Sequence, residues 1–82
     1  MKVPRDLSGE QLSRLLRKYG YVTTRQTGSH IRLTSTRMGS EHHITVPAHR
    51  NLKIGTLAGI LGGVAEYLGI SREEVSRNLF GS

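Results

Sequence analysis

The chain is 82 residues long, which predicts a single domain over residues 1–82 with one thin core. It has no cysteine and no apolar stretch long enough for a signal peptide or a membrane span. This composition excludes disulfides, thiol catalysis and cysteine–zinc sites, and it predicts a cytoplasmic protein with no membrane partner. Its net charge is +6, and nine of its 12 basic side chains are arginine, whose planar fork binds phosphate.

The first predicted element is a helix that begins after Ser8. Ser8 and Gln11 form a capping box, in which each side chain satisfies a free backbone N–H of the first turn. Gly20 supplies the left-handed residue that ends the helix. Between these signals, apolar side chains recur with helical spacing and predict one buried stripe: Leu12, Leu15, Leu16 and Tyr19.

The period then changes to two, which predicts three strands at residues 21–26, 30–35 and 42–46. Thr27-Gly28 is predicted to form the first turn, and residues 37–40 a looser second turn. The turn at Thr27-Gly28 pairs Arg25 with His30, and the second hairpin pairs Leu33 with Ile44. The inward side chains are then Val22, Thr24, Ile31, Leu33, Ile44 and Val46. The outward side chains are Thr23, Arg25, His30, Arg32, Thr34, His43 and Thr45.

A second helix is predicted over residues 56–68, and a third runs from the Ser71 cap to about Leu79. Glycines at Gly55, Gly59 and Gly63 are four apart, which predicts that a neighbouring backbone packs closely there. The fold class is therefore α+β in the order α-β-β-β-α. It is a three-stranded antiparallel sheet with helices on one face and the other face open.

His30 is the first candidate for chemistry, because it starts a strand on the open face near Arg25 and Arg32. Imidazole titrates near neutral pH and can accept or donate a proton. RNA carries its own nucleophile, the 2′-hydroxyl, so no metal is required, and one histidine with adjacent guanidinium groups can do much of the catalysis. On spacing alone, a strand-end histidine that merely faces solvent is the alternative.

The basic excess lies in the first two-thirds of the chain. Residues 1–53 carry 10 basic against 3 acidic side chains (+7), and residues 54–82 carry 2 against 3 (−1). This asymmetry favours nucleic acid as a partner over a generally solvated surface. The side chains predicted to contact RNA are Arg25, Ser29, Arg32, His49, Arg50 and Lys53, with the last three in the same groove as His30. His42 and His43 leave their strand on opposite faces, so neither a metal site nor a cofactor is predicted.

Taken together, several motifs make the chain resemble the HicA family of bacterial and archaeal toxins, which are small messenger-RNA endonucleases. The motifs are Leu7-Ser8-Gly9, Gly20-Tyr21, Arg25-Gln26-Thr27-Gly28-Ser29-His30, Val46-Pro47-Ala48-His49, Gly55-Thr56-Leu57 and Ile60-Leu61. The resemblance implies a fold like a double-stranded-RNA-binding domain, with the catalytic histidine at His30. It also implies a type II toxin–antitoxin system in which a HicB-like antitoxin occludes the active site.

Two other functions remain open at this point. One is a non-catalytic RNA-binding module of the same fold, in which His30 only forms hydrogen bonds. The other is an interaction domain whose basic face meets an acidic protein. The Gly28-Ser29-His30 motif favours the ribonuclease, since plain binding does not require it.

Overall fold

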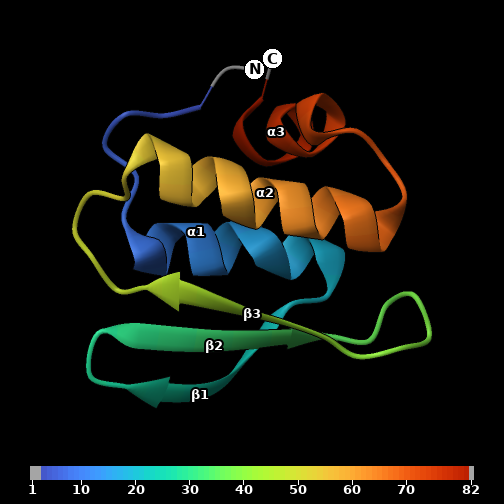
Figure 1. Cartoon of the computed structure of the whole chain (residues 1–82), viewed down its shortest axis with the longest axis horizontal. Helices are drawn as coiled ribbons and strands as arrows, with labels where there is room; N and C mark the ends of the chain where they lie inside the picture. The colour runs from blue at the N-terminus through green and yellow to red at the C-terminus, as the bar shows by residue number, and fades with distance from the viewer. Residues whose placement is uncertain (1–2, 82) are drawn as a thin grey trace.

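The computed structural model describes residues 3–81; Met1, Lys2 and Ser82, which the predicted domain includes, lie outside this part. Its elements follow the predicted α+β order, with two helices after the sheet (Figure 1). They are α1 (Gly9–Leu15), the 3₁₀ helix η1 (Leu16–Tyr19), β1 (Val22–Thr27), β2 (His30–Ser35), β3 (His42–Pro47), α2 (Ile54–Leu68) and α3 (Arg72–Phe80).

The predicted capping of the first helix is confirmed. The Ser8 hydroxyl accepts the N–H of Gln11 at 3.1 Å, and the Gln11 side chain accepts the N–H of Ser8 at 2.9 Å. The helix tightens to a 3₁₀ turn at Leu16 and ends at Gly20, which has φ of 84°. Leu12 and Leu16 are fully buried, so the local signals also set which face of the helix enters the core.

The strands form one antiparallel sheet in the order β1-β2-β3. The predicted pairing of the second hairpin is confirmed, with Leu33 opposite Ile44 and Ile31 opposite Val46. The predicted pairing of the first hairpin is wrong, because Thr27 pairs with His30 and the turn consists of Gly28 and Ser29.

The reason for this turn is the backbone of Gly28, which has φ of 53°. With Gly28 as the first central residue, the turn needs a positive φ only at a glycine. The predicted turn would have placed Thr27, a β-branched residue, at that first position, where a positive φ is strained.

The corrected register changes the orientation of β1. Val22 and Thr24, predicted to point inward, are exposed, and 54% of the surface of Val22 is accessible to solvent. Thr23, predicted to point outward, instead lines a hollow beside α1. A β-bulge between Thr23 and Arg25 accompanies this change.

The helices cover the sheet through β2 and β3. β1 lies at the sheet edge away from them (Figure 1), and all six of its residues are exposed. The core is formed by the helices together with the inner faces of β2 and β3. Its fully buried members include Leu12, Leu16, Tyr21, Leu33, Val46, Leu61, Val64 and Val75.

The glycines of α2 do not serve the predicted close packing. Within residues 3–81, a Cβ added at Gly55 or Gly59 would meet no atom within 4 Å, and one at Gly63 would meet only the His42 ring at 4.0 Å. No neighbouring backbone of the described residues therefore approaches these positions. Within residues 3–81, no single helix has the length and apolar composition to cross a membrane; α2 and α3 meet that test only as a pair bent by 107°.

Candidate functional site

The open face of the sheet carries a shallow hollow of about 320 Å³. It is lined by Arg25, Thr27, His30, Arg32 and Thr45. The residues come from all three strands, because Thr27 pairs with His30, and Arg32 lies between Arg25 and Thr45. The predicted association of His30 with Arg25 and Arg32 is therefore present, although it arises from a different register.

Arg25 and Arg32 are direct cross-strand partners, which places two positive charges side by side. Like charges in this position repel each other and destabilise a sheet. Among residues 3–81, neither guanidinium has an acidic partner, since the only ion pair joins His43 and Glu41. An anion bound between the two arginines would offset the repulsion, and a phosphate group matches their planar donors.

The segment after β3 is held beside the start of β2 by backbone hydrogen bonds. The Ala48 N–H donates to the Ser29 carbonyl at 2.7 Å, and the Gly9 N–H donates to the His49 carbonyl at 3.0 Å. A further bond joins the Leu52 N–H to the Leu7 carbonyl at 2.8 Å. These contacts fix the loop next to the turn that precedes His30.

Among the described residues, none of the three loop side chains predicted to share a groove with His30 lines the hollow around it. His49, Arg50 and Lys53 are exposed. Arg50 lines a separate hollow of about 560 Å³ at the start of α1, together with Asp6, Ser8, Glu10, Gln11, Arg14 and Asn51. The structure therefore does not bring Arg50 into the predicted common groove. Lys53 is the N-cap of α2, and its side chain makes no capping bond.

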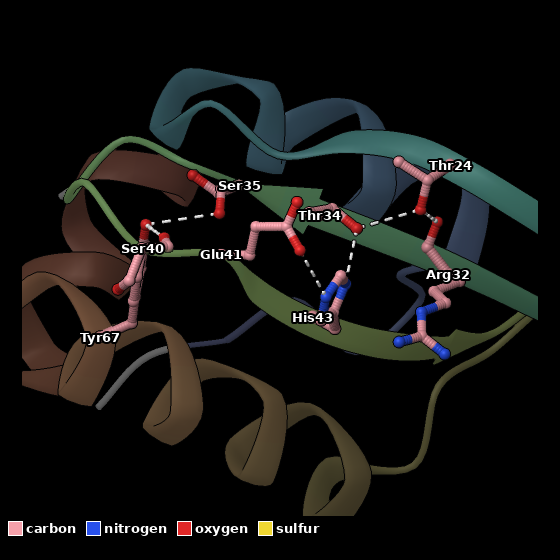
Figure 2. A network of polar contacts seen from close by, with 8 residues as sticks. All are labelled: Thr24, Arg32, Thr34, Ser35, Ser40, Glu41, His43 and Tyr67. Carbon is pink, nitrogen blue, oxygen red and sulfur yellow. Dashed lines mark hydrogen bonds and ion pairs between the residues drawn. The ribbon is translucent and has the colours of Figure 1, made fainter.

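A chain of polar contacts crosses the same open face beside Arg32 (Figure 2). The Glu41 carboxylate lies 3.3 Å from Nε2 of His43, and Nδ1 of His43 lies 2.8 Å from the Thr34 hydroxyl. The Thr34 hydroxyl lies 3.0 Å from that of Thr24, which also donates to the Arg32 carbonyl at 3.4 Å. We call Thr24, Thr34, His43 and Glu41 the threonine–histidine chain.

Sequence reasoning missed this chain. The alternation of β2 and β3 predicted Thr34 and His43 on one outward face, and they are direct cross-strand partners, although Thr34 is buried with 9% of its surface exposed. It placed Thr24 on the inner face and gave Glu41 no role. The signal in the sequence was the pairing of the Thr34 hydroxyl with the His43 imidazole on one face of the sheet. That pairing does not indicate the bulge in β1, which adds Thr24 to the chain.

His42 belongs to a different cluster on the inner side, as the predicted divergence of the two histidines requires. Its Nδ1 lies 2.6 Å from the hydroxyl of Tyr21, and its ring stacks on Tyr67 at 4.7 Å. Burial, with a smaller contribution from Tyr67, raises the pKa of Tyr21 to about 12. The Tyr67 hydroxyl donates to the Ser40 carbonyl at 2.5 Å, so this cluster fastens the β2–β3 connection to α2.

Among residues 3–81, no group of three or more histidine, aspartate or glutamate side chains lies together in a way that could hold a metal ion. The two histidines on the open face of the sheet have separate surroundings. One is His30 beside the arginine pair, and the other is His43 with Glu41.

Comparison with protein families matches residues 9–70 to the HicA toxin of bacterial toxin–antitoxin systems. No match was found among curated proteins or among solved structures, so the likeness to a double-stranded-RNA-binding domain stays a prediction. The matched segment covers more than half of the chain and includes α1, the whole sheet and α2. This chain therefore belongs to the HicA family of bacterial toxins, which act in toxin–antitoxin systems.

Proposed function

We propose that this toxin is a metal-independent endoribonuclease that cleaves messenger RNA in the cytoplasm, with His30 as the catalytic residue. The observation that supports the proposal is the hollow in which His30 lies beside two guanidinium groups that have no acidic partner among residues 3–81. Such a hollow offers a proton acceptor and a phosphate-binding pair within one small area.

The proposed reaction uses the 2′-hydroxyl of the RNA as the nucleophile. His30 accepts the proton of that hydroxyl while the 2′-oxygen forms a bond to phosphorus. The bond from phosphorus to the 5′-oxygen breaks, and the leaving oxygen takes a proton from the imidazolium or from water. The products are a 2′,3′-cyclic phosphate and a 5′-hydroxyl. Arg25 and Arg32 stabilise the negative charge on the phosphate oxygens.

The remaining predicted contacts extend the RNA path around this centre. Ser29 lies in the turn before His30, and His49 follows the segment that is bonded to that turn. Arg50 and Lys53 add positive charge farther along the loop. A HicB-like antitoxin would inhibit the enzyme by covering the open face.

The decisive experiment is incubation of the purified protein with a defined messenger RNA, with and without EDTA. We expect cleavage that is unaffected by the chelator and fragments that end in 2′,3′-cyclic phosphate. RNA binding without cleavage would support the non-catalytic module instead. Binding to an acidic protein without either RNA activity would support the interaction domain. Cleavage that EDTA abolishes would contradict the metal-independent mechanism.

The arginine pair makes a separate prediction about RNA affinity. Arg25→Ala and Arg32→Ala should each weaken RNA binding, and each should reduce the slope of log K against log salt by about one. The measurement is a binding titration at several salt concentrations. Arg72→Ala is the matched control, because Arg72 is an exposed arginine in α3, away from the open face. Unchanged salt slopes in both hollow variants would show that RNA lies elsewhere.

A further inference from the structure

β1 does not alternate as a regular strand does. Thr23 lines the hollow beside α1, on the helix side of the sheet. Arg25 lines the hollow around His30, on the open side. In a regular strand, residues two apart point to the same face, so the direction of the side chains reverses between these two positions. The bulge between Thr23 and Arg25 is the cause.

The pairing shows what the chain would do without this bulge. Thr23 pairs with Leu33, and a regular antiparallel ladder from that pair would place Arg25 opposite Ile31. Ile31 is buried under the helices, with 3% of its surface exposed. Arg25 would then point toward the helix side. With the bulge, Arg25 lies opposite Arg32 instead.

The extra residue of the bulge is Thr24, and its hydroxyl is bonded to β2. It contacts the Thr34 hydroxyl at 3.0 Å and donates to the Arg32 carbonyl at 3.4 Å. Thr34 is itself held by Nδ1 of His43, whose other ring nitrogen lies 3.3 Å from the Glu41 carboxylate. An unpaired bulge residue on an edge strand thus gains side-chain bonds that a residue without a hydroxyl could not make.

We propose that the threonine–histidine chain positions Arg25 in the active site by holding the bulge at Thr24. Its members are positioning residues, and Arg25 is the group that contacts the phosphate. This inference rests on the proposed function for its effect on RNA, although the orientation of Arg25 can be tested without RNA. It gives Thr24, Thr34, His43 and Glu41 a role in substrate binding that none of them performs by direct contact.

The test compares two replacements of Thr24 that differ in the hydroxyl. Thr24→Val keeps the branched shape and loses the hydroxyl, whereas Thr24→Ser keeps the hydroxyl. If Arg25→Ala weakens RNA binding by about ten-fold, the scale of a hydrogen bond to a charged group, Thr24→Val should cause most of the same loss. Thr24→Ser should bind RNA as the parent does. Adding Thr24→Val to Arg25→Ala should cause no further loss of RNA affinity, because both changes remove the same contact between Arg25 and the phosphate.

A cysteine cross-link tests the orientation of residue 25 independently of activity. The chain contains no cysteine, so Arg25→Cys with Arg32→Cys introduces one defined pair. Directly opposite residues have Cα atoms about 4.5–5.5 Å apart, within the range of a disulfide. We expect the disulfide to form on oxidation in the Thr24 and Thr24→Ser backgrounds and to be strongly reduced with Thr24→Val.

RNA binding and cross-linking together distinguish the positioning role of Thr24 from the assignment of the open face as the RNA-binding face. Equal cross-linking in all three backgrounds would overturn the positioning role of Thr24, whatever the RNA results are. Parent-like RNA binding by Thr24→Val, with Arg25→Ala impaired, would overturn it as well. If Arg25→Ala itself binds RNA normally while the cross-link depends on Thr24, the bulge is held as proposed and the assignment of the RNA face is wrong.

Discussion

Replacing His30 with alanine is expected to lower RNA cleavage by at least about 10²-fold, the lower end of the contribution from general acid–base catalysis. The side chain is exposed on the open face, so its removal leaves the core unchanged. RNA affinity should be largely retained, because Arg25 and Arg32 remain. The measurements are single-turnover cleavage, an RNA binding titration and a thermal unfolding curve for parent and variant.

His30→Gln separates catalysis from simple hydrogen bonding. Glutamine can donate and accept hydrogen bonds but does not exchange a proton near neutral pH. It should therefore be as inactive as alanine if His30 transfers the proton. If His30→Gln cleaves RNA like the parent, the histidine serves only to bind. Cleavage by His30→Ala at the parental rate would remove the catalytic assignment altogether.

The second large effect is expected at Gly9, where α1 begins. A Cβ at this position would lie 1.9 Å from the Pro47 carbonyl oxygen and 3.1 Å from Cα of Ala48. Both are backbone atoms, which cannot rotate away as a side chain can. Gly9→Ala should therefore lower the free energy of unfolding by about 1–3 kcal/mol, the usual cost of overpacking. It should also displace the end of β3, where Pro47 pairs with His30, and so reduce cleavage.

Gly59→Ala provides the control for this prediction. Gly59 is an exposed residue within α2, and a Cβ there would meet no atom of the described residues within 4 Å. Alanine is favoured over glycine inside a helix by about 1 kcal/mol, so this variant should be at least as stable as the parent. Chemical denaturation of both variants gives the comparison. A Gly9→Ala protein with parental stability and activity would show that the α1–Pro47 contact is not needed.

The importance of Gly9 could not be predicted from its neighbours in the sequence. Next to Ser8, a glycine at the first helical position is unremarkable. Its requirement comes from Pro47, a residue of a distant strand that crosses the helix start. The hydrogen bond from the Gly9 N–H to the His49 carbonyl reinforces the same approach. Contacts between segments so far apart in the chain leave no local pattern.

The open-face site illustrates the same division. His30, Arg25 and Arg32 were predicted to lie together, and they line one hollow. The predicted reason was a turn at Thr27-Gly28, whereas the observed reason is a turn one residue later together with a bulge. The three side chains were therefore correctly predicted to lie together, but from an incorrect register. The same error in the register led to the wrong prediction that Val22 and Thr24 point inward.

The sequence alone determined the features that depend on neighbours within one helical turn or one strand. These include the Ser8–Gln11 capping box, the left-handed end of the first helix at Gly20, and the pairing of β2 with β3. The capping box follows from backbone donors that nearby side chains satisfy, the helix end from the positive φ that glycine adopts without strain, and the strand pairing from apolar residues that must share a face. Only the tertiary structure decided the register of β1 and the faces to which its side chains point. An edge strand with six exposed residues has no buried stripe to specify its register. Its bulge is held instead by hydroxyl contacts from Thr24 to Thr34 across the sheet.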